Sequence, residues 1–194
     1  MRRTPSADVV AFRYAGIFNS ALREVKAIRR RYLAQYLRYP FGALPTRYLK
    51  DLRAFAVLAS ATLEQCAEDL IWAHLYHMAS DVNSRAAGAA LSLKAANLLQ
   101  GYGEASLDKS HGLKGNQFRD VSAAGGITPT VTPPQWNSFE QLGIIRNESA
   151  HSYVVTVRDP KDVWAYACDV MTCVRAVGIQ CATRAVGFRP VPPP

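Results

Sequence analysis

The segment from residue 46 to residue 79 constrains the fold of this chain more than any other. Small and aliphatic residues recur along it at alternating steps of three and four: Leu49, Leu52, Ala56, Ala59, Leu63, Cys66, Leu70 and Ala73. This spacing places one continuous apolar stripe along a helix and is typical of the seam in a left-handed helical bundle. The small residues in the stripe would let a neighbouring helix approach closely. The sequence therefore predicts a long helix here that packs within a bundle.

Several other segments also have a helical spacing of apolar residues. They run from about Asp8 to Tyr39, from about Asn83 to Leu99 and from about Trp136 to His151. A last helix is expected to run to about Arg184, because Asp159 and Pro160 provide an N-cap and a proline at the first helical position. Long amphipathic helices with almost no strand pattern predict an all-α, up-and-down bundle of four to five main helices.

The rest of the chain is less regular. Residues 104–136 are expected to form short helical turns broken by Gly112 and Gly115, followed by a loop that contains residues 125–134. Residues 152–157 are expected to be a short extended connection. The organisation expected is one domain over residues 1–187, with a basic N-terminal helix, and a flexible proline-rich tail over residues 188–194.

Composition limits the class of protein. The chain has 194 residues, enough for one domain with a sizeable core, and no uncharged apolar run long enough to cross a membrane, so we expect a soluble, cytoplasmic protein. Its four cysteines include no C-x-x-C pair and are expected to be buried, reduced side chains. His74 and His77 have no matching set of ligands nearby, so we expect surface or interface histidines, no metal site and no cofactor.

The positive charge of the chain is concentrated near its N-terminus. The formal net charge is +8, and residues 1–53 alone hold 12 Lys and Arg against 3 Asp and Glu, a net of +9. Such a surface suits a polyanionic partner such as RNA, although a solvated basic helix face gives the same pattern. The candidate RNA contacts are Arg29, Arg30 and Arg31 in this region, with Lys109, His111, Lys114 and Arg119 as a second basic and polar cluster.

Three polar residues close the helix that is expected to end at His151. Phe139, Leu142, Ile145 and Ser149 share its expected bundle-facing stripe; Asn147 and His151 lie four residues apart on a second stripe. The Asn147 amide could therefore orient the imidazole. Arg146 is five residues before His151, which corresponds to ~140° of rotation and ~7.5 Å of rise. The two side chains can converge only around the helix or across an interface.

Other catalytic patterns are missing from the sequence. It contains no G-x-x-x-x-G-K-[ST], no H-E-x-x-H and no G-x-S-x-G, and no G-x-G-x-x-G follows a strand. Glu64, on the long helix of residues 46–79, could orient a catalytic histidine, but a solvated or helix-paired acid would look the same. Arg146 and His151 also have a non-catalytic explanation: the arginine could be an exposed surface residue, and a histidine at the C-terminus of a helix stabilises the helix dipole.

The string RNESAH, together with the helical architecture and the early segment ASATLEQCAEDLIWAHL, resembles the HEPN superfamily. The resemblance is greatest to its stand-alone RiboL-PSP-HEPN-like group, in which segments comparable to SHGLKG and AAGGI precede the motif helix, and it covers residues 46–184. In that family the motif consists of an arginine, usually an asparagine, a short spacer and a histidine. Here these are Arg146, Asn147 and His151.

The resemblance implies a metal-independent endoribonuclease that works as a homodimer, with the two motifs facing each other across a shared cleft. An imidazole titrates near neutral pH, so His151 could move the protons of the 2′-OH and the leaving 5′-oxygen. Arg146 could bind the phosphate through its planar fork, and Asn147 could position the histidine or the phosphate. We expect 2′,3′-cyclic phosphate and 5′-OH ends.

Such an enzyme would act as an RNase toxin or antiviral defence effector, with an antitoxin or a defence-system protein as a further partner. Two alternatives remain open from the sequence. The chain could be a non-catalytic HEPN module that binds RNA or a partner protein, or a structural bundle in which the motif is accidental.

Overall fold

The structure is a computed structural model that describes residues 7–79, 97, 115–151 and 158–186. Five α-helices and one 3-10 turn make up the secondary structure of these residues, which contain no strand. The all-α prediction is therefore confirmed. The expected helix of residues 83–99, the connection over residues 152–157 and the tail over residues 188–194 lie outside the described residues.

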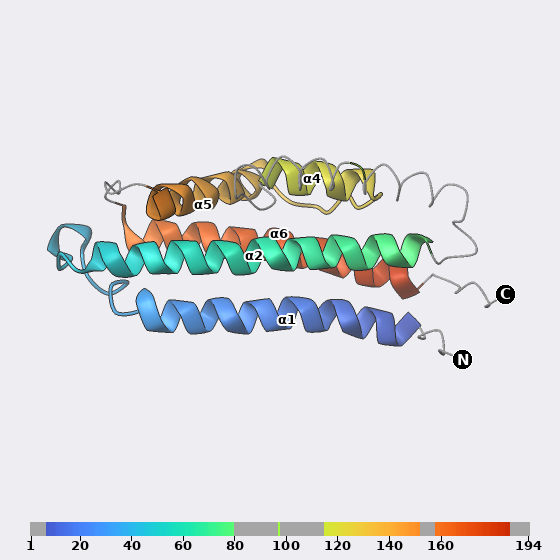
Figure 1. The fold of residues 1–194 in the computed structure, drawn as a ribbon, viewed down its shortest axis with the longest axis horizontal. Coiled ribbons are helices and arrows are strands. Elements are labelled where there is room, and N and C mark those ends of the chain that lie inside the picture. The colour runs from blue at the N-terminus through green and yellow to red at the C-terminus, as the bar shows by residue number, and fades with distance from the viewer. Residues whose placement is uncertain (1–6, 80–96, 98–114, 152–157, 187–194) are drawn as a thin grey trace.

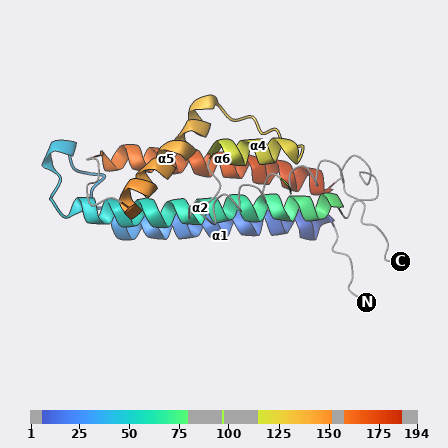
Figure 2. The same cartoon turned by 45° about the horizontal axis from the view of Figure 1, so that its top comes forward.

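Four long helices form the body of the molecule. They are α1 (Ala7–Tyr32), α2 (Tyr48–Ala79), α5 (Pro133–His151) and α6 (Pro160–Val186), and the short α4 (Gly115–Ala124) packs mainly against α5. Both α1 and α5 pack against α2 and α6, which also contact each other. Figures 1 and 2 show that α1 and α5 lie on opposite sides of the α2–α6 pair.

The core follows the apolar stripe that the sequence predicts on α2. Leu52, Ala56, Ala59, Leu63, Cys66 and Leu70 are all buried, while Leu49 and Ala73 at the two ends are partly buried. The facing residues of α6 are Val163, Val170, Cys173, Val177 and Cys181, and none of them is exposed to solvent. At Gly178 an added Cβ would lie 3.5 Å from a methyl group of Leu70, so a small residue suits the close approach of α6 to α2. The helix–helix seam expected from the sequence is confirmed.

Two helix boundaries differ from the prediction. The first helix ends at Tyr32, not near Tyr39, because the chain turns after it and buries Leu33 and Tyr36. Helix α5 begins at Pro133 and not near Trp136. The Gln135 side chain reaches back over this helix start, where its Oε1 accepts the backbone N–H and the hydroxyl of Thr132, both at 3.0 Å. A proline at the first helical position needs no N–H partner.

The less regular segment also contains more helix than expected. Residues from Gly115 to Ala124 form one continuous helix, α4. The helix is followed by a turn at Gly126, whose φ of 76° lies in the left-handed region that glycine adopts freely. The N–H of Ile127 then bonds to the carbonyl of Ser122 at 2.8 Å and closes the helix end. The start of α6 is as predicted, because the Asp159 carboxylate accepts the N–H of Lys161 at 2.8 Å.

Candidate functional site

The C-terminal half of α5 carries the motif residues and has the orientation that the sequence predicts. Phe139, Leu142 and Ile145 are buried against the bundle. Asn147 is half-buried and His151, the last residue of the helix, is exposed. The bundle-facing stripe is thus confirmed for these three residues, while Ser149, its fourth predicted member, is only partly buried, and the exposed histidine does not belong to it. Whether the Asn147 amide orients the His151 imidazole stays a prediction.

Arg146 extends from α5 to α2. Its Nη1 donates to Oε2 of Glu64 at 3.0 Å, and the side chains of the two residues are only 12% and 10% exposed. The other carboxylate oxygen of Glu64 accepts the hydroxyl of Ser60 at 3.1 Å. The three residues, called here the Arg146 network, form a polar connection within an otherwise apolar interface.

The Arg146 network excludes one of the roles that the sequence left open for Glu64, whereas the orientation of a catalytic histidine by this residue stays a prediction. Glu64 is 8% exposed, so its reading as a solvated acid is wrong. Charges in such an interface are tolerated because each is paired and hydrogen-bonded, and a guanidinium suits this because it offers several donors in one plane. The Nε of Arg146 is also buried and has no hydrogen-bond partner among the described residues. The Glu64 carboxylate therefore does not use all the donors of this guanidinium.

The end of α5 is also attached to the start of the next helical segment. Nη2 of Arg158, just before α6, lies 3.1 and 3.3 Å from the two carboxylate oxygens of Glu148. Their side chains are 24% and 28% exposed. Sequence reasoning missed both residues and also Ser60. The i, i+4 spacing of Ser60 and Glu64 was the one signal available, whereas nothing in the sequence indicates that Arg158 turns back towards Glu148.

The candidate RNA contacts that the structure describes are not gathered around the motif. Arg29 is half-buried, with its guanidinium 4.6 Å from the centre of the Trp164 ring, whereas Arg30 and Arg31 are exposed at the end of α1. Because α1 and α5 lie on opposite sides of the bundle, these arginines share an end of the molecule with His151 but not a face (Figures 1 and 2). Arg119 on α4 is exposed beside Asp120. Lys109, His111 and Lys114 lie outside the described residues.

One expectation about the histidines is wrong. His74 is completely buried, and its Nε2 lies 2.9 Å from the carbonyl oxygen of Gly125. The carbonyl can only accept, so Nε2 donates and joins α2 to the end of α4. His74 is buried because α2 passes beneath the turn that follows α4. The side chain of His77 lies outside the described part, within which no group of His, Cys, Asp or Glu could hold a metal ion.

Three of the four cysteines are buried, as the sequence predicts, and the fourth is not. All four are free, and Cys66, Cys173 and Cys181 are buried while Cys168 is partly exposed. Burial raises the pKa of the Cys66, Cys173 and Cys181 thiols to about 12. A thiol with so high a pKa is protonated at neutral pH and is a poor nucleophile. These three cysteines act as small apolar side chains of the core.

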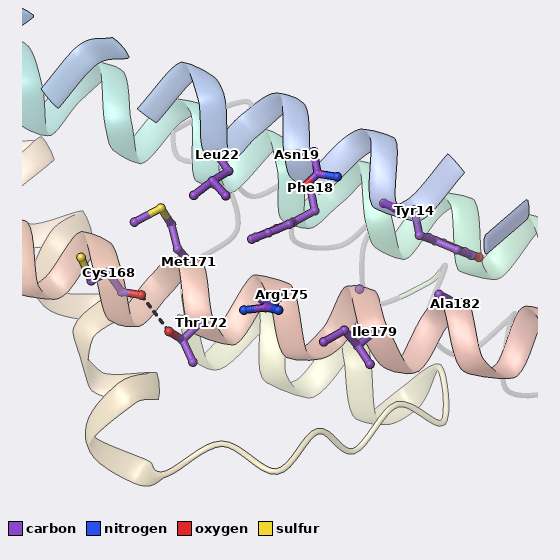
Figure 3. Close-up of a pocket in the computed structure, with 12 residues that line it drawn as sticks. Tyr14, Phe18, Asn19, Leu22, Cys168, Met171, Thr172, Arg175, Ile179 and Ala182 are labelled. Atoms are coloured by element: carbon purple, nitrogen blue, oxygen red, sulfur yellow. Dashed lines mark hydrogen bonds between the residues drawn. The ribbon is translucent and has the colours of Figure 1, made fainter. Parts of the chain in front are cut away.

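A separate groove lies between α1 and α6 (Figure 3). Its volume is about 540 Å³, and apolar side chains such as Phe18, Leu22, Met171 and Ile179 line it, with the charged Arg175 among them. No residue of α5 contributes to it. The groove is therefore distinct from the Arg146 network and from His151.

Comparisons with known proteins add no identification. Searches against family models, curated proteins and solved structures find no match for this chain. Within the described residues, no helix is both long and apolar enough to span a membrane. The HEPN resemblance therefore depends on the motif and the helical architecture alone.

Proposed function

We propose that this protein is a metal-independent endoribonuclease of the toxin or defence type, with Arg146, Asn147 and His151 at its active site. One observation carries the proposal. Arg146 is fixed by Glu64 and Ser60 inside the α2–α5 interface, while His151 of the same motif is exposed at the end of α5. A fixed cationic group on the same helix as an accessible imidazole, five residues before it, is an arrangement that phosphodiester cleavage can use if the two side chains reach one phosphate.

Cleavage of RNA without a metal requires three events. The 2′-OH loses a proton and attacks the neighbouring phosphorus, negative charge develops on the phosphate oxygens, and the 5′-oxygen gains a proton as its bond to phosphorus breaks. His151 transfers a proton, and Arg146 offers positive charge to the phosphate. The products are a 2′,3′-cyclic phosphate and a 5′-OH end, and no cofactor takes part.

A single chain provides one motif histidine, but the reaction uses both a base and an acid. Ile144, on the same helix and 39% exposed, gives this part of α5 an apolar surface that a partner could cover. A two-fold homodimer would bring two copies of His151 to one cleft, as base and acid. Sedimentation or light scattering tests this directly, because an active enzyme that is strictly monomeric would contradict the shared site.

A second candidate function is supported by the burial of Arg146. Its side chain is 12% exposed and its Nη1 is occupied by Glu64, so the arginine could instead stabilise the interface of a non-catalytic module that binds RNA or a partner protein. In that case the ion pair between Arg146 and Glu64 is purely structural and His151 has no catalytic role.

The deciding experiment measures cleavage of end-labelled RNA in EDTA by the wild type and by point variants. We expect His151→Ala to lower the cleavage rate by at least ~100-fold, since general acid–base catalysis contributes about that much or more. Arg146→Lys, which keeps the positive charge but loses the planar fork, should also be strongly impaired. End mapping should find cyclic phosphate only with active protein.

The controls separate loss of chemistry from loss of folding and from contaminating RNase. Arg184→Ala removes an exposed arginine near the C-terminal end of α6, far from the motif, and should cleave like the wild type. Circular dichroism should show that every variant is folded. Equal cleavage by the wild type and His151→Ala would rule out the proposed enzyme, and RNA binding without cleavage would support the non-catalytic module.

A further inference from the structure

We propose that the connection between α1 and α2 is a platform on which single-stranded RNA stacks its bases. The platform is defined here as residues 33–47 together with the cations that flank them. The inference rests on the proposed function, because it takes RNA as the ligand, and it deepens that function by assigning the surface and the form of RNA that it binds.

The platform is strongly basic. Residues 29–53 contain seven Lys and Arg and one acid, a net charge of +6. The exposed cations are Arg30, Arg31, Arg38, Arg47 and Lys50. The acid, Asp51, is already occupied: one of its oxygens accepts the Tyr36 hydroxyl at 2.5 Å and the Gln35 amide at 3.3 Å. The remaining charge is available to neutralise phosphates.

Exposed aromatic rings lie among these cations. Tyr39 and Phe41 are 49% and 44% exposed, on either side of Pro40. Exposing two large rings to water is unfavourable, and in single-strand binding proteins such rings carry stacked bases, with cations following the backbone. The combination of rings and cations is what a polyanion with planar bases would recognise.

The platform is held in place from beneath. Tyr36 and Tyr48 are almost fully buried, with their ring centres 6.2 Å apart in an edge-to-face contact. Arg47 also donates to the side chain of Gln35 at 3.1 Å. Two aromatic residues thus anchor the connection to the bundle while Tyr39 and Phe41 face solvent. Such preorganisation reduces the entropy lost when a ligand binds.

A membrane surface would also attract cations and aromatic rings, but the composition favours RNA. Four of the five exposed cations are arginines, whose planar fork pairs with phosphates and stacks on rings. The other apolar residues do not form a wedge for insertion into lipid, because Leu33 is buried and Leu37 and Leu44 are partly buried against the core.

The location of the platform also fits a ribonuclease. The connection projects beyond the end of the bundle at which α5 terminates with His151, as both views show (Figures 1 and 2). An RNA strand bound to the platform would lie at the same end of the molecule as His151, the proposed catalytic histidine. The platform would thus supply affinity that the motif itself does not.

The test measures binding of fluorescein-labelled single-stranded RNA by anisotropy, in a His151→Ala background that prevents cleavage. Tyr39→Ala and Phe41→Ala should each weaken binding by ~10-fold, the loss expected for one stacked base. Phe41→Leu should weaken it similarly, since it keeps an apolar side chain but loses the ring, whereas Phe41→Trp should restore it. Arg38→Ala should reduce the dependence of binding on salt concentration.

Trp72→Ala is the matched control, because Trp72 is an equally exposed aromatic residue on α2, outside the platform. It should bind RNA like the parent. Unchanged binding in both Tyr39→Ala and Phe41→Ala would overturn the platform. The platform would also be overturned if the two substitutions left RNA binding unchanged but weakened binding to phosphatidylserine vesicles.

Failure of the platform and failure of the ribonuclease remain distinguishable. If the wild type cleaves RNA but the two aromatic substitutions change neither binding nor cleavage, the platform is wrong and the enzyme stands. If binding depends on the rings but the wild type does not cleave RNA, the platform stands and the catalytic proposal fails.

Discussion

Two ion pairs on α5 show how differently the same chemistry acts in two parts of the molecule. Arg146 pairs with Glu64 inside the α2–α5 interface, and two residues further along the helix Glu148 pairs with Arg158 at the junction with α6. The first pair is at most 12% exposed, whereas the second is 24–28% exposed. Both pairs have N–O distances near 3 Å, so burial and not geometry distinguishes them.

The difference has an energetic consequence. Water near the second pair screens its attraction and solvates either partner left alone, so its net contribution is small. In the interface, an unpaired charge has little water to compensate for its lost partner. The Arg146 network should therefore make the packing of α5 on α2 sensitive to single substitutions, even if the pair adds little over an apolar contact.

The largest expected effect is that of Glu64→Leu. It leaves the Arg146 guanidinium buried without a counter-charge and should lower the free energy of unfolding by about 3 kcal/mol, the loss typical of a broken buried pair. Urea denaturation followed by circular dichroism measures the change. The double variant Glu64→Leu, Arg146→Leu should be more stable than Glu64→Leu alone, because it removes both charges. A loss no larger than that of Arg158→Ala would contradict the comparison.

A smaller effect is expected for Arg158→Ala. The Glu148 carboxylate it leaves behind is reached by water, so the free energy of unfolding should fall by only about 0.5 kcal/mol. Repeating the urea series at high salt sharpens the comparison. Salt should diminish the effect of Arg158→Ala and leave that of Glu64→Leu nearly unchanged, since screening acts mainly on exposed charges.

The smallest effect is expected for Arg119→Ala on α4. Arg119 and Asp120 are adjacent in the chain, and their side chains are 56% and 50% exposed. Pairs of this kind often contribute nothing measurable. The urea midpoint should match that of the wild type at any salt concentration. A clear loss of stability would mean that exposure is not what ranks the three pairs.

Periodicity predicted the helices and their inward faces well. The buried stripe of α2 and the burial of Phe139, Leu142 and Ile145 on α5 follow from spacing alone, because a helix presents one face to its neighbours. The boundaries were harder to predict, because they depend on local hydrogen bonds. The start of α5 depends on the cap between Thr132 and Gln135, and the end of α1 on the burial of Leu33 and Tyr36.

The candidate site was predictable only in part. The direction of His151 away from the core follows from its place on the helix, and the structure agrees. The burial of His74 could not be predicted from its place on a helix, because its hydrogen-bond partner is a backbone carbonyl 51 residues away in the chain, beyond the end of α4. Periodicity predicts which face of a helix is buried, but it does not predict which residues of other elements that face contacts.

Helical spacing and charge in the sequence were sufficient to predict an all-helical bundle, the inward stripe of α2, the basic N-terminal quarter of the chain and the placement of Asn147 and His151 off the buried stripe of α5. The folded structure was needed to show that Arg146 pairs with Glu64, 82 residues earlier in the chain, and that the basic end of α1 lies across the bundle from α5. The physical reason is that a helical period fixes angles around one axis. The relative placement of the axes depends on how all the apolar faces pack together.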